Sequence, residues 1–526
     1  MSIAVSNLDH LGIVAGIIDE IGLVKQINEQ IGTDSREKIS SGLVVKAMIL
    51  NGLGFVSSPL YMFSNFFEGK AIEHLLGEGI KAEYLNDDRL GRVLDKLQEI
   101  GLEQIFVVII LAVVKKYKID IRTVHVDSSS FSVQGEYENS DSETNPQSIN
   151  ITYGYSRDHR PDLKQFMMDL MCSEDGDIPL GLRIGSGNES DQQQFGKLLQ
   201  EFKSQMQWDS LMVLDSGFYS QENLQMSQNL SWLSRVPLRI KAAHKDVHSE
   251  AIAEFVPSQL EGYRFCEIPQ NYGGIPQRWL LVESQKRRES DLKKLDKNLK
   301  KEAIESEKKL RELGRQTFAC EADARKAAHK LLLKSKCHQL TDINIEKVTD
   351  KKNKEAVYKV QGAVTVCEDK ITPYRQSAGR FVLATNVLDP EVLTAEEMLS
   401  KYKGQQSVER GFRFLKDPMF FTDSVFLKSP KRIEALGLIM GLCLLVYNLG
   451  QRQLRQTLKH RQRTVPNQLG RPTNCPTLRW IFQCFQSIHV LGMGELRQIS
   501  NINDQRLLLL EFFPAACQRY YLLKSG

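Results

Sequence analysis

Apolar residues recur at helical spacing through the first part of the chain. Between Ile13 and Ile31 they follow one another mostly at steps of three and four residues, which favours an amphipathic helix. Ser40–Ser41 and Asn86–Asp88 stand before two further apolar stripes, and side chains of these types cap helix N-termini. The pattern predicts a helical domain over residues 1–118.

A run of β-forming residues begins at Ile121 and ends at Asp127. His125 falls on the same face of this predicted strand as Asp127, and we expect it to lie in the core. The elements predicted next are strands at 165–172 and 178–184, a helix at 192–206, a strand at 211–214 that ends before Asp215, a helix at 221–226 and a strand at 231–236. This order predicts a mixed α/β sheet.

Residues 237–394 have a different pattern of apolar and charged residues. Strand-like runs at 261–282 and 357–384 flank a stretch rich in Lys and Glu. Leucines in this stretch fall near heptad spacing, at 292, 295, 299, 310 and 313, so the stretch is predicted to be helical. Its charged side chains form either a solvated face or an arm that contacts DNA.

Helical spacing returns at 395–416 and recurs toward the end of the chain, with a break at Pro514. The run at 435–447 is apolar apart from Gly437 and Gly441, which would let a neighbouring element approach closely. Together with 105–114 it is shorter than the ~20 residues that a membrane span needs, so both runs are predicted to be buried helices and no membrane is expected. Residues 452–471 are basic and are predicted to form an exposed helix that runs into a loop.

Composition describes a large folded protein with local concentrations of positive charge. The 526 residues, 41% of them hydrophobic and 25% charged, correspond to about three or four domains. The net charge is only +4, but residues 286–336 carry a surplus of +8, and residues 451–480 carry seven basic and no acidic side chains. Two basic segments on an acidic remainder favour a polyanionic partner.

The cysteines and the N-terminus indicate a reducing compartment. The nine cysteines are odd in number and include no Cys-x-x-Cys pair, which argues against a disulfide framework or a zinc ribbon. The first residues have neither a basic segment nor a long apolar core, so no signal peptide is predicted. The expected location is the cytoplasm.

Two carboxylates, Asp127 and Asp215, stand at predicted strand ends, and Ser follows each of them. Held at one edge of a sheet, they would repel each other unless they shared divalent cations. Two Mg²⁺ ions about 3.5–4 Å apart suit in-line phosphoryl displacement, since one activates the attacking oxygen and the other stabilises the leaving oxygen. Such a site needs a third carboxylate. The alternative is that both side chains are ordinary loop caps.

The third candidate carboxylate is Glu409. Residues 402–416 are predicted to form a helix on which Glu409, Phe412, Arg413 and Lys416 recur at three- and four-residue steps. Glu409 can then face the sheet edge, while Lys416 lies two turns further on and can touch a phosphate. The alternative is a surface helix that carries ordinary ion pairs.

The sequence resembles the DDE transposases of bacterial insertion sequences, in the group marked by Tyr-x2-Arg-x3-Glu-x6-Lys. The chain has Tyr402, Gln405, Glu409 and Lys416 at those positions, so Gln replaces the Arg. Other stretches that resemble the family are VHVDSSSF around Asp127, GYSRDHRPDLKQ at 154–165, GNESD at 187–191 and LDSGFYS around Asp215. NDDRLGRVLDKL at 86–97 and RPTNCPTLRWIFQ at 471–483 are similar to the subgroup with an extended N-terminal helical domain.

The resemblance implies an α/β protein with a ribonuclease H-like catalytic core that is interrupted by an insertion domain. The implied segments are a helical domain that binds DNA ends at 1–118, the first part of the core at 119–236, the insertion domain at 237–394, the helix with the catalytic Glu at 395–430, and a helical C-terminal region for DNA contact or dimerisation at 431–526. Asp127, Asp215 and Glu409 are implied to be catalytic and to bind two Mg²⁺ ions, which Mn²⁺ can replace.

The implied reaction is cleavage of double-stranded DNA at the terminal inverted repeats of the mobile element, followed by joining of the 3′-OH ends to target DNA. The expected DNA contacts are Tyr402 and Lys416 by family analogy, Gln405 and Arg413 in the same predicted helix, and Arg157, Arg160 and Lys164 in a basic loop near the core. Gln405 lacks the bidentate cationic fork of Arg. Because two ends are cut together, a homodimer on DNA is expected. The alternatives are a DNA-binding protein that no longer cuts and a nuclease without strand transfer.

Overall fold

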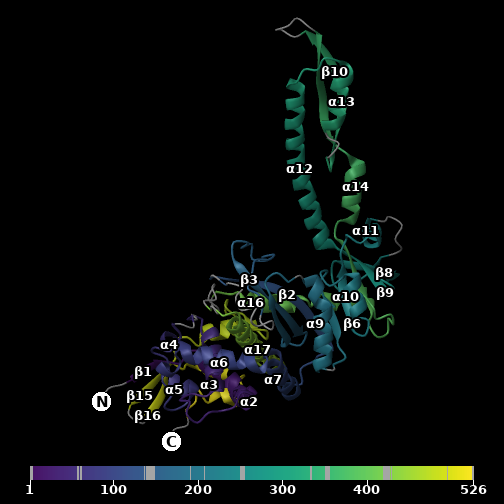
Figure 1. The fold of residues 1–526 in the computed structure, drawn as a ribbon. Helices are drawn as coiled ribbons and strands as arrows, with labels where there is room; N and C mark the ends of the chain where they lie inside the picture. The colour runs from purple at the N-terminus through teal and green to yellow at the C-terminus, as the bar shows by residue number, and fades with distance from the viewer. Residues whose placement is uncertain are drawn as a thin grey trace. The chain divides into compact units, whose positions relative to one another are not determined.

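The computed structural model describes most of the chain (Figure 1): residues 4–55, 58–59, 62–135, 137, 149–189, 191–206, 208–248, 255–331, 335–349, 356–418, 427, 429–493 and 496–523. Ser190, within the motif at 187–191, lies outside these residues. The chain divides into two compact units. Unit 1 comprises Met1–Trp232 and Lys401–Gly526, and unit 2 comprises Leu233–Ser400.

The N-terminal part of unit 1 is helical, as its apolar spacing predicts. Its helices are α1 (Leu11–Ile21), α2 (Leu23–Ile31), α3 (Ser41–Gly52), α4 (Phe63–Phe66), α5 (Ile72–Leu76), the 3₁₀ turn η2 (Ala82–Tyr84), α6 (Asp87–Ile100) and α7 (Leu102–Tyr117). The predicted caps are confirmed, since the side chains of Ser40 and Asn86 accept backbone N–H groups in the first turns of α3 and α6. The apolar series at 13–31 is two helices rather than one, because Gly22 adopts a φ of 76° and ends α1.

The sheet of unit 1 contains, in spatial order, β4 (Pro179–Ser186), β3 (Lys164–Ser173), β2 (Thr123–Val133) and β5 (Leu211–Leu214). β3 is antiparallel to both of its neighbours, β4 and β2, and β5 is parallel to β2. The helix α9 (Asp191–Met206) precedes β5, and α10 (Gln221–Met226) and β6 (Ser231–Val236) follow it. The predicted order is confirmed with one correction: β2 does not end at Asp127, because Ser128–Val133 stay paired with β3.

The helix α17 (Pro430–His460) joins the N-terminal helices to this sheet. It packs against α1, α3 and α6, and also against β4. A Cβ atom added to Gly437 would lie 2.5 Å from Cδ1 of Ile184, and one added to Gly441 would lie 2.7 Å from Cδ2 of Leu182. The predicted close approach at these two glycines is confirmed, and larger residues would push α17 away from the sheet.

α17 is longer than its predicted apolar run. Its 31 residues include a stretch long and apolar enough to cross a membrane, but 89% of that stretch is buried inside the protein, as in a core helix. Arg452, predicted to lie on an exposed helix, is buried instead, and its guanidinium pairs with Asp175 at 2.5 Å. This burial is possible because the carboxylate compensates the charge.

The C-terminal part of unit 1 contains α18 (Leu478–Cys484), α19 (Asp504–Leu510) and α20 (Ala515–Gln518), the last two separated at Pro514 as predicted. It also contains short strands that helical spacing does not reveal. β15 (His489–Met493) pairs with β1 (Ala4–Asn7) and β16 (Leu496–Ser500), and β13 (Val465–Pro466) pairs with β14 (Pro472–Thr473). β1 and β16 are largely exposed, so no hydrophobic alternation marks them.

Unit 2 has an antiparallel sheet of its own, in which the unit 2 residues of β6 pair with β12 (Arg380–Thr385), followed by β9 (Ile275–Ser284), β8 (Tyr263–Tyr272) and β7 (Val256–Pro257). The charged stretch forms the helix α12 (Gln285–Arg315), as predicted. It packs against α13 (Glu321–Leu331) and the hairpin of β10 (His338–Thr349) and β11 (Ala356–Val366), as Figure 1 shows. The remaining helices of the unit are α11 (Lys241–His248), α14 (Glu368–Ser377) and the first part of α15 (Ala395–Lys403).

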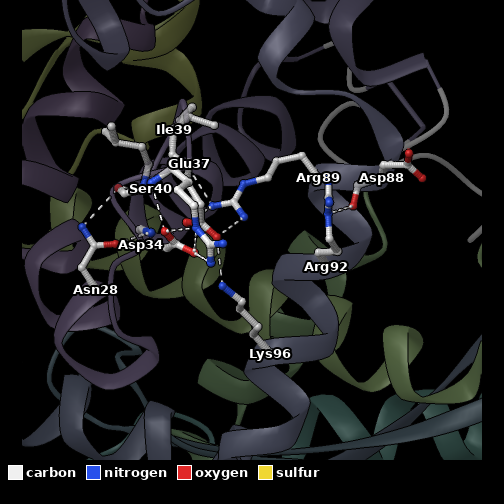
Figure 2. Close-up of polar contacts among 12 residues, drawn as sticks. Asn28, Asp34, Glu37, Ile39, Ser40, Asp88, Arg89, Arg92 and Lys96 are labelled. Carbon is white, nitrogen blue, oxygen red and sulfur yellow. Dashed lines mark hydrogen bonds and ion pairs between the residues drawn. The ribbon is translucent and has the colours of Figure 1, made fainter.

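A buried ion-pair network ties the loop before α3 to α6 (Figure 2). The guanidinium of Arg89, which is 8% exposed, donates to both carboxylate oxygens of Glu37 at 2.7 and 2.6 Å and to the backbone oxygen of Ile39 at 2.7 Å. Lys96 also donates to Glu37, at 3.0 Å. Burial raises the pKa of Glu37, but the hydrogen bonds from the two cations outweigh it and leave the pKa below its ordinary value of 4.5.

We expect Arg89→Ala to lower the free energy of unfolding by about 2 kcal/mol at neutral pH, because Glu37 keeps a largely buried charge without its main partner. Lys96→Ala is the control: the Lys96 side chain is 37% exposed, and its loss should cost about 1 kcal/mol or less. Because the folded-state pKa of Glu37 is lowered, the stabilisation is present above pH 4.5 and is lost as the pH falls through the folded-state pKa. Urea unfolding at pH 7 and at a series of lower pH values measures both effects. Equal losses in the two variants at pH 7, or an Arg89→Ala loss that does not shrink as the pH falls, would contradict this account.

Candidate active site

The parallel pairing of β2 with β5 places two candidate carboxylates side by side. Val126 pairs with Leu214, and this is the last pair of that ladder. Asp127 and Asp215 are the next residues on the two strands, which lie about 4.8 Å apart. Asp215 follows β5 directly, as predicted, whereas Asp127 lies within β2 at the point where the parallel pairing ends.

Both Asp side chains are half-buried and take part in hydrogen bonds. One oxygen of Asp127 accepts the backbone N–H of Ser128 at 2.8 Å and lies 3.6 Å from Nη1 of Arg157. One oxygen of Asp215 accepts the backbone N–H of Gly217 at 2.8 Å. Arg157 therefore balances part of the negative charge at this edge of the sheet.

The helix α16 (Gln406–Leu415) lies over the face of β2 that carries Asp127. By strand alternation, His125 and Phe131 share that face. Just before α16, the backbone of Gly404 approaches the His125 ring so closely that an added Cβ atom would lie 3.1 Å from Cε1 and Nε2. Further along, the Phe412 ring lies 6.4 Å from the Phe131 ring, measured between centroids. The helix and the strand therefore run in the same direction.

Glu409 lies on α16 between these two contacts, and Asp127 lies between them on β2, so the two carboxylates stand at a similar level. Val408 and Phe412 are buried in the core beside β2 and β3. Glu409 is exposed on the flank of the helix. The structure thus makes Asp127 and Asp215 neighbours on adjacent strands, and Glu409 lies on the helix that packs against β2.

Tyr402 and Gln405 are not on the helix that carries Glu409. The helix predicted at 402–416 is broken at Gly404: Tyr402 lies in the last turn of α15, and Gln405 is the residue before α16. The close packing of Gly404 on His125 accounts for the break, since a glycine permits such an approach and weakens a helix interior. Both side chains are half-buried.

Lys416 follows α16 directly. Its ammonium donates to a carboxylate oxygen of Asp158 at 2.8 Å and lies 5.0 Å from the centre of the Phe131 ring. Arg413 is exposed on α16. The loop that holds Asp158 also holds Arg157. This segment before β3 therefore brings the Arg157 guanidinium to Asp127 and fixes the Lys416 ammonium through Asp158.

The other two residues of the predicted basic loop lie farther from the carboxylates. Arg160 is exposed and pairs with Asp162 at 2.8 Å. Lys164 donates to the backbone oxygen of Tyr137 at 2.5 Å. Lys164 is also the register partner of Val133, which is six residues beyond Asp127 and therefore about 20 Å along the strand.

His125 is fully buried beside this site. Burial, together with the positive charges of Lys401 and Arg410, lowers its pKa to about 4, so the ring is neutral at physiological pH. Among the described residues neither ring nitrogen has a hydrogen-bond partner. The ring therefore contributes to the structure through its packing against Gly404.

Asp127, Asp215 and Glu409 supply carboxylate oxygens, which hard divalent cations such as Mg²⁺ prefer. In the described part of the chain, no three His, Cys, Asp or Glu side chains are gathered closely enough to hold a metal ion. The chemistry of the donor set fits a divalent cation. Its assembly requires the exposed Glu409 side chain to turn toward the Asp pair.

A buried ionic network behind this edge escapes sequence reasoning. Asp169 on β3 accepts the Ser128 hydroxyl at 2.5 Å and Nε of Arg183 at 2.7 Å, and Arg183 also donates to Glu189 at 2.7 Å. Because successive strand residues alternate, the network lies on the opposite face of β2 from Asp127. The signal available in the sequence is an Asp inside the apolar run at 165–172, since a buried carboxylate needs partners.

Fold and site together define a class: an α/β protein whose sheet presents paired carboxylates, with the donor chemistry of a divalent cation site, at the end of a parallel strand pair. A family model described as the transposase DDE domain matches residues 119–449, and a model described as a domain of unknown function (DUF4277) matches residues 3–111. No curated protein matches the chain significantly.

Among solved structures, the cryo-EM structure of a piggyBac transposase synaptic complex with hairpin DNA is 10% identical to this chain. The match covers 98% of this chain and 81% of that one, with a TM-score of 0.37, which is a weak similarity.

The transposase DDE domain model spans more than half of the chain, so the chain belongs to the DDE transposase family. It is an α/β protein in which the antiparallel strands β4, β3 and β2 and the parallel strand β5 form a ribonuclease H-like core. Enzymes of this family cleave DNA in transposition and generally use divalent metal ions.

We expect Gly404→Val to lower the free energy of unfolding by about 1–3 kcal/mol, because the new side chain would overlap the His125 ring and the backbone oxygen of Lys401. His125→Ala would open space for it. The double variant should therefore lose at least about 0.5 kcal/mol less than the sum of the two single losses, as measured by chemical denaturation of all four proteins. Additive losses would show that α16 is not positioned by this contact.

Proposed function

We propose that this chain is a metal-dependent DNA transposase whose catalytic ions are held by Asp127, Asp215 and Glu409. The observation that carries the proposal is the β2–β5 ladder, which makes the two Asp residues neighbours beneath the helix that bears Glu409. Two Mg²⁺ ions, replaceable by Mn²⁺, would activate the attacking oxygen and stabilise the leaving oxygen of a phosphodiester.

The side chains around the carboxylates have separate tasks. Arg157 compensates Asp127 before the cations bind, and it can turn to a DNA phosphate once they neutralise the carboxylates. Lys416 is held between Asp158 and the Phe131 ring, two turns beyond Glu409. This position offers an ammonium group to a phosphate near the scissile bond without reading a base.

Further DNA contacts are proposed for Tyr402, Gln405, Arg413, Arg160 and Lys164. Gln405 is half-buried at the start of α16 and can donate a neutral hydrogen bond, but it cannot clamp a phosphate as Arg does. Arg160 and Lys164 are farther from the carboxylates, so they suit DNA that flanks the cleavage point or target DNA.

In the proposed reaction the protein binds the terminal inverted repeats of a bacterial insertion sequence of the Tyr-Arg-Glu-Lys group, cleaves there, and joins the 3′-OH ends to target DNA. Residues 1–118 would bind the ends, residues 237–394 would be the insertion domain, and residues 431–526 would contact DNA or form the dimer. A homodimer is proposed because two ends are processed together. The proposed location is the cytoplasm, with the protein on the nucleoid when it is bound to DNA.

We expect Asp127→Asn, Asp215→Asn and Glu409→Gln each to lower Mg²⁺-dependent cleavage of DNA that carries the element ends by at least about 100-fold, because each removes a ligand worth several kcal/mol to the transition state. End binding, measured by gel shift, should persist in all three variants. Glu289→Gln changes an exposed carboxylate on α12 and is the matched control, which should cleave as wild type does.

The outcomes separate the proposed transposase from its alternatives. Wild-type protein that binds ends but cleaves in neither Mg²⁺ nor Mn²⁺ would be a DNA-binding protein. Cleavage without joined products in the presence of target DNA would identify a nuclease that lacks strand transfer.

Divalent cations should raise the unfolding temperature of wild-type protein in the absence of DNA. A ligand at 100 times its Kd stabilises the folded state by about 2.7 kcal/mol. Asp215→Asn should lose this response. In EDTA it should unfold at or above the wild-type temperature, because it removes one of two adjacent like charges. Differential scanning fluorimetry with and without Mn²⁺ makes the measurement. An equal Mn²⁺ response in the variant would place the bound ion elsewhere.

A further inference from the structure

Most of the basic residues of the long helix α12 lie on one side of it. On a wheel of 100° per residue, seven residues between Lys293 and Arg311 fall within one sector about 100° wide. One of them is Ile304. The other six, which we name the α12 basic stripe, are Lys293, Lys297, Lys300, Lys301, Lys308 and Arg311.

The opposite side of α12 is packed against the rest of unit 2, and this fixes where the stripe points. Leu313 is buried in a cluster with Ala324, Ala328 and Val360, and Ser306 is buried as well. On the wheel, Leu313 and Ser306 lie about 170° and 190° from the centre of the stripe. All six stripe residues are exposed. The stripe is therefore on the side of α12 that faces away from this packed cluster.

Among the described residues, one close ion pair involves the stripe, while Asp296, Glu305 and Glu312 of α12 lie outside its sector. Arg311 pairs with Glu307 at 3.3 Å. Glu302, an acid on α12 outside the stripe, accepts the Ser335 hydroxyl and the backbone N–H of Lys336, both at 2.8 Å. Among the residues that the structure describes, the five lysines of the stripe have no ion-pair partner within 4.0 Å.

Like charges repeated along successive turns repel one another, and a polyanion offsets that repulsion. A membrane-binding amphipathic helix would present a broad apolar face. Here the apolar face of α12 is packed within unit 2, and Ile304 is the one apolar residue in the sector of the stripe. A second copy of the stripe would bring the same sign of charge. A long, regular polyanion is the partner that fits.

We propose that the α12 basic stripe is a docking surface for the sugar–phosphate backbone of double-stranded DNA outside the catalytic core. The 18 residue steps from Lys293 to Arg311 span about 27 Å at 1.5 Å per residue, which equals the length of about eight base pairs. Lysines act as point charges and read phosphate rather than sequence, so this contact extends the footprint without selecting bases. The inference rests on the proposed function, which supplies the DNA.

The test measures the affinity of the full chain for a 40-base-pair duplex of arbitrary sequence by fluorescence anisotropy, over a series of salt concentrations. The stripe variant replaces four lysines by Gln, at Lys293, Lys297, Lys301 and Lys308. The control variant makes the same change in net charge at four exposed lysines of unit 2 outside the stripe, at Lys309, Lys326, Lys330 and Lys347. Gln has a helix propensity close to that of Lys, and circular dichroism checks the fold.

The stripe variant should bind at least tenfold more weakly near 0.1 M salt. Its slope of log K against log salt should be shallower by about 3 to 4, because each lost phosphate contact removes about 0.9. The control variant should keep the wild-type slope, and replacing the same four stripe lysines by Arg should preserve binding. Equal effects in the stripe and control variants, or no change in either, would overturn the proposal.

The binding readout is independent of cleavage. If wild-type protein fails to cleave but the stripe variant shows the expected loss of slope, the proposed catalytic function fails and the docking surface stands. If wild-type protein cleaves and the stripe variant keeps its slope, the docking surface fails alone.

Discussion

Adjacent carboxylates at the end of the β2–β5 ladder are the constraint around which unit 1 is arranged. Backbone pairing makes Asp127 and Asp215 neighbours despite the repulsion between their negative charges. Arg157 and backbone N–H groups offset part of the repulsion on the side of the site, and the Asp169–Arg183 pair anchors the strands from the opposite face of the sheet. Charge is thereby concentrated where divalent cations can relieve it, as phosphoryl-transfer chemistry requires.

Two helices fix the surroundings of that edge by close packing at glycines. α17 reaches β4 because Gly437 and Gly441 have no side chains, so the N-terminal helices and the sheet share one buried helix. α16 begins where Gly404 rests on the buried, neutral ring of His125, and this contact sets the level of Glu409 along β2. Glu409 itself is exposed, so in the proposed metal site its side chain would have to turn toward the two Asp residues.

Much of this arrangement can be predicted from the sequence, because local signals agree with the fold. The elements at 211–214, 221–226 and 231–236, the caps at Ser40 and Asn86 and the close approach at Gly437 each follow from short-range chemistry. What escapes prediction depends on partners far along the chain. β2 continues past Asp127 because β3 pairs with its serine-rich half, and Arg452 is buried because Asp175 meets it. The break at Gly404 is set by His125, almost 280 positions earlier in the sequence.

The convergence of three carboxylates on divalent ions is the central claim, and a crystal structure of the protein bound to a DNA end in Mn²⁺ tests it most directly. Anomalous scattering at the manganese edge would locate the ions independently of the protein. The account predicts two ions about 3.5–4 Å apart, with oxygens of Asp127, Asp215 and Glu409 at about 2.0–2.3 Å from them. Ions bound away from the two Asp residues, or Glu409 still directed to solvent with DNA in place, would contradict it.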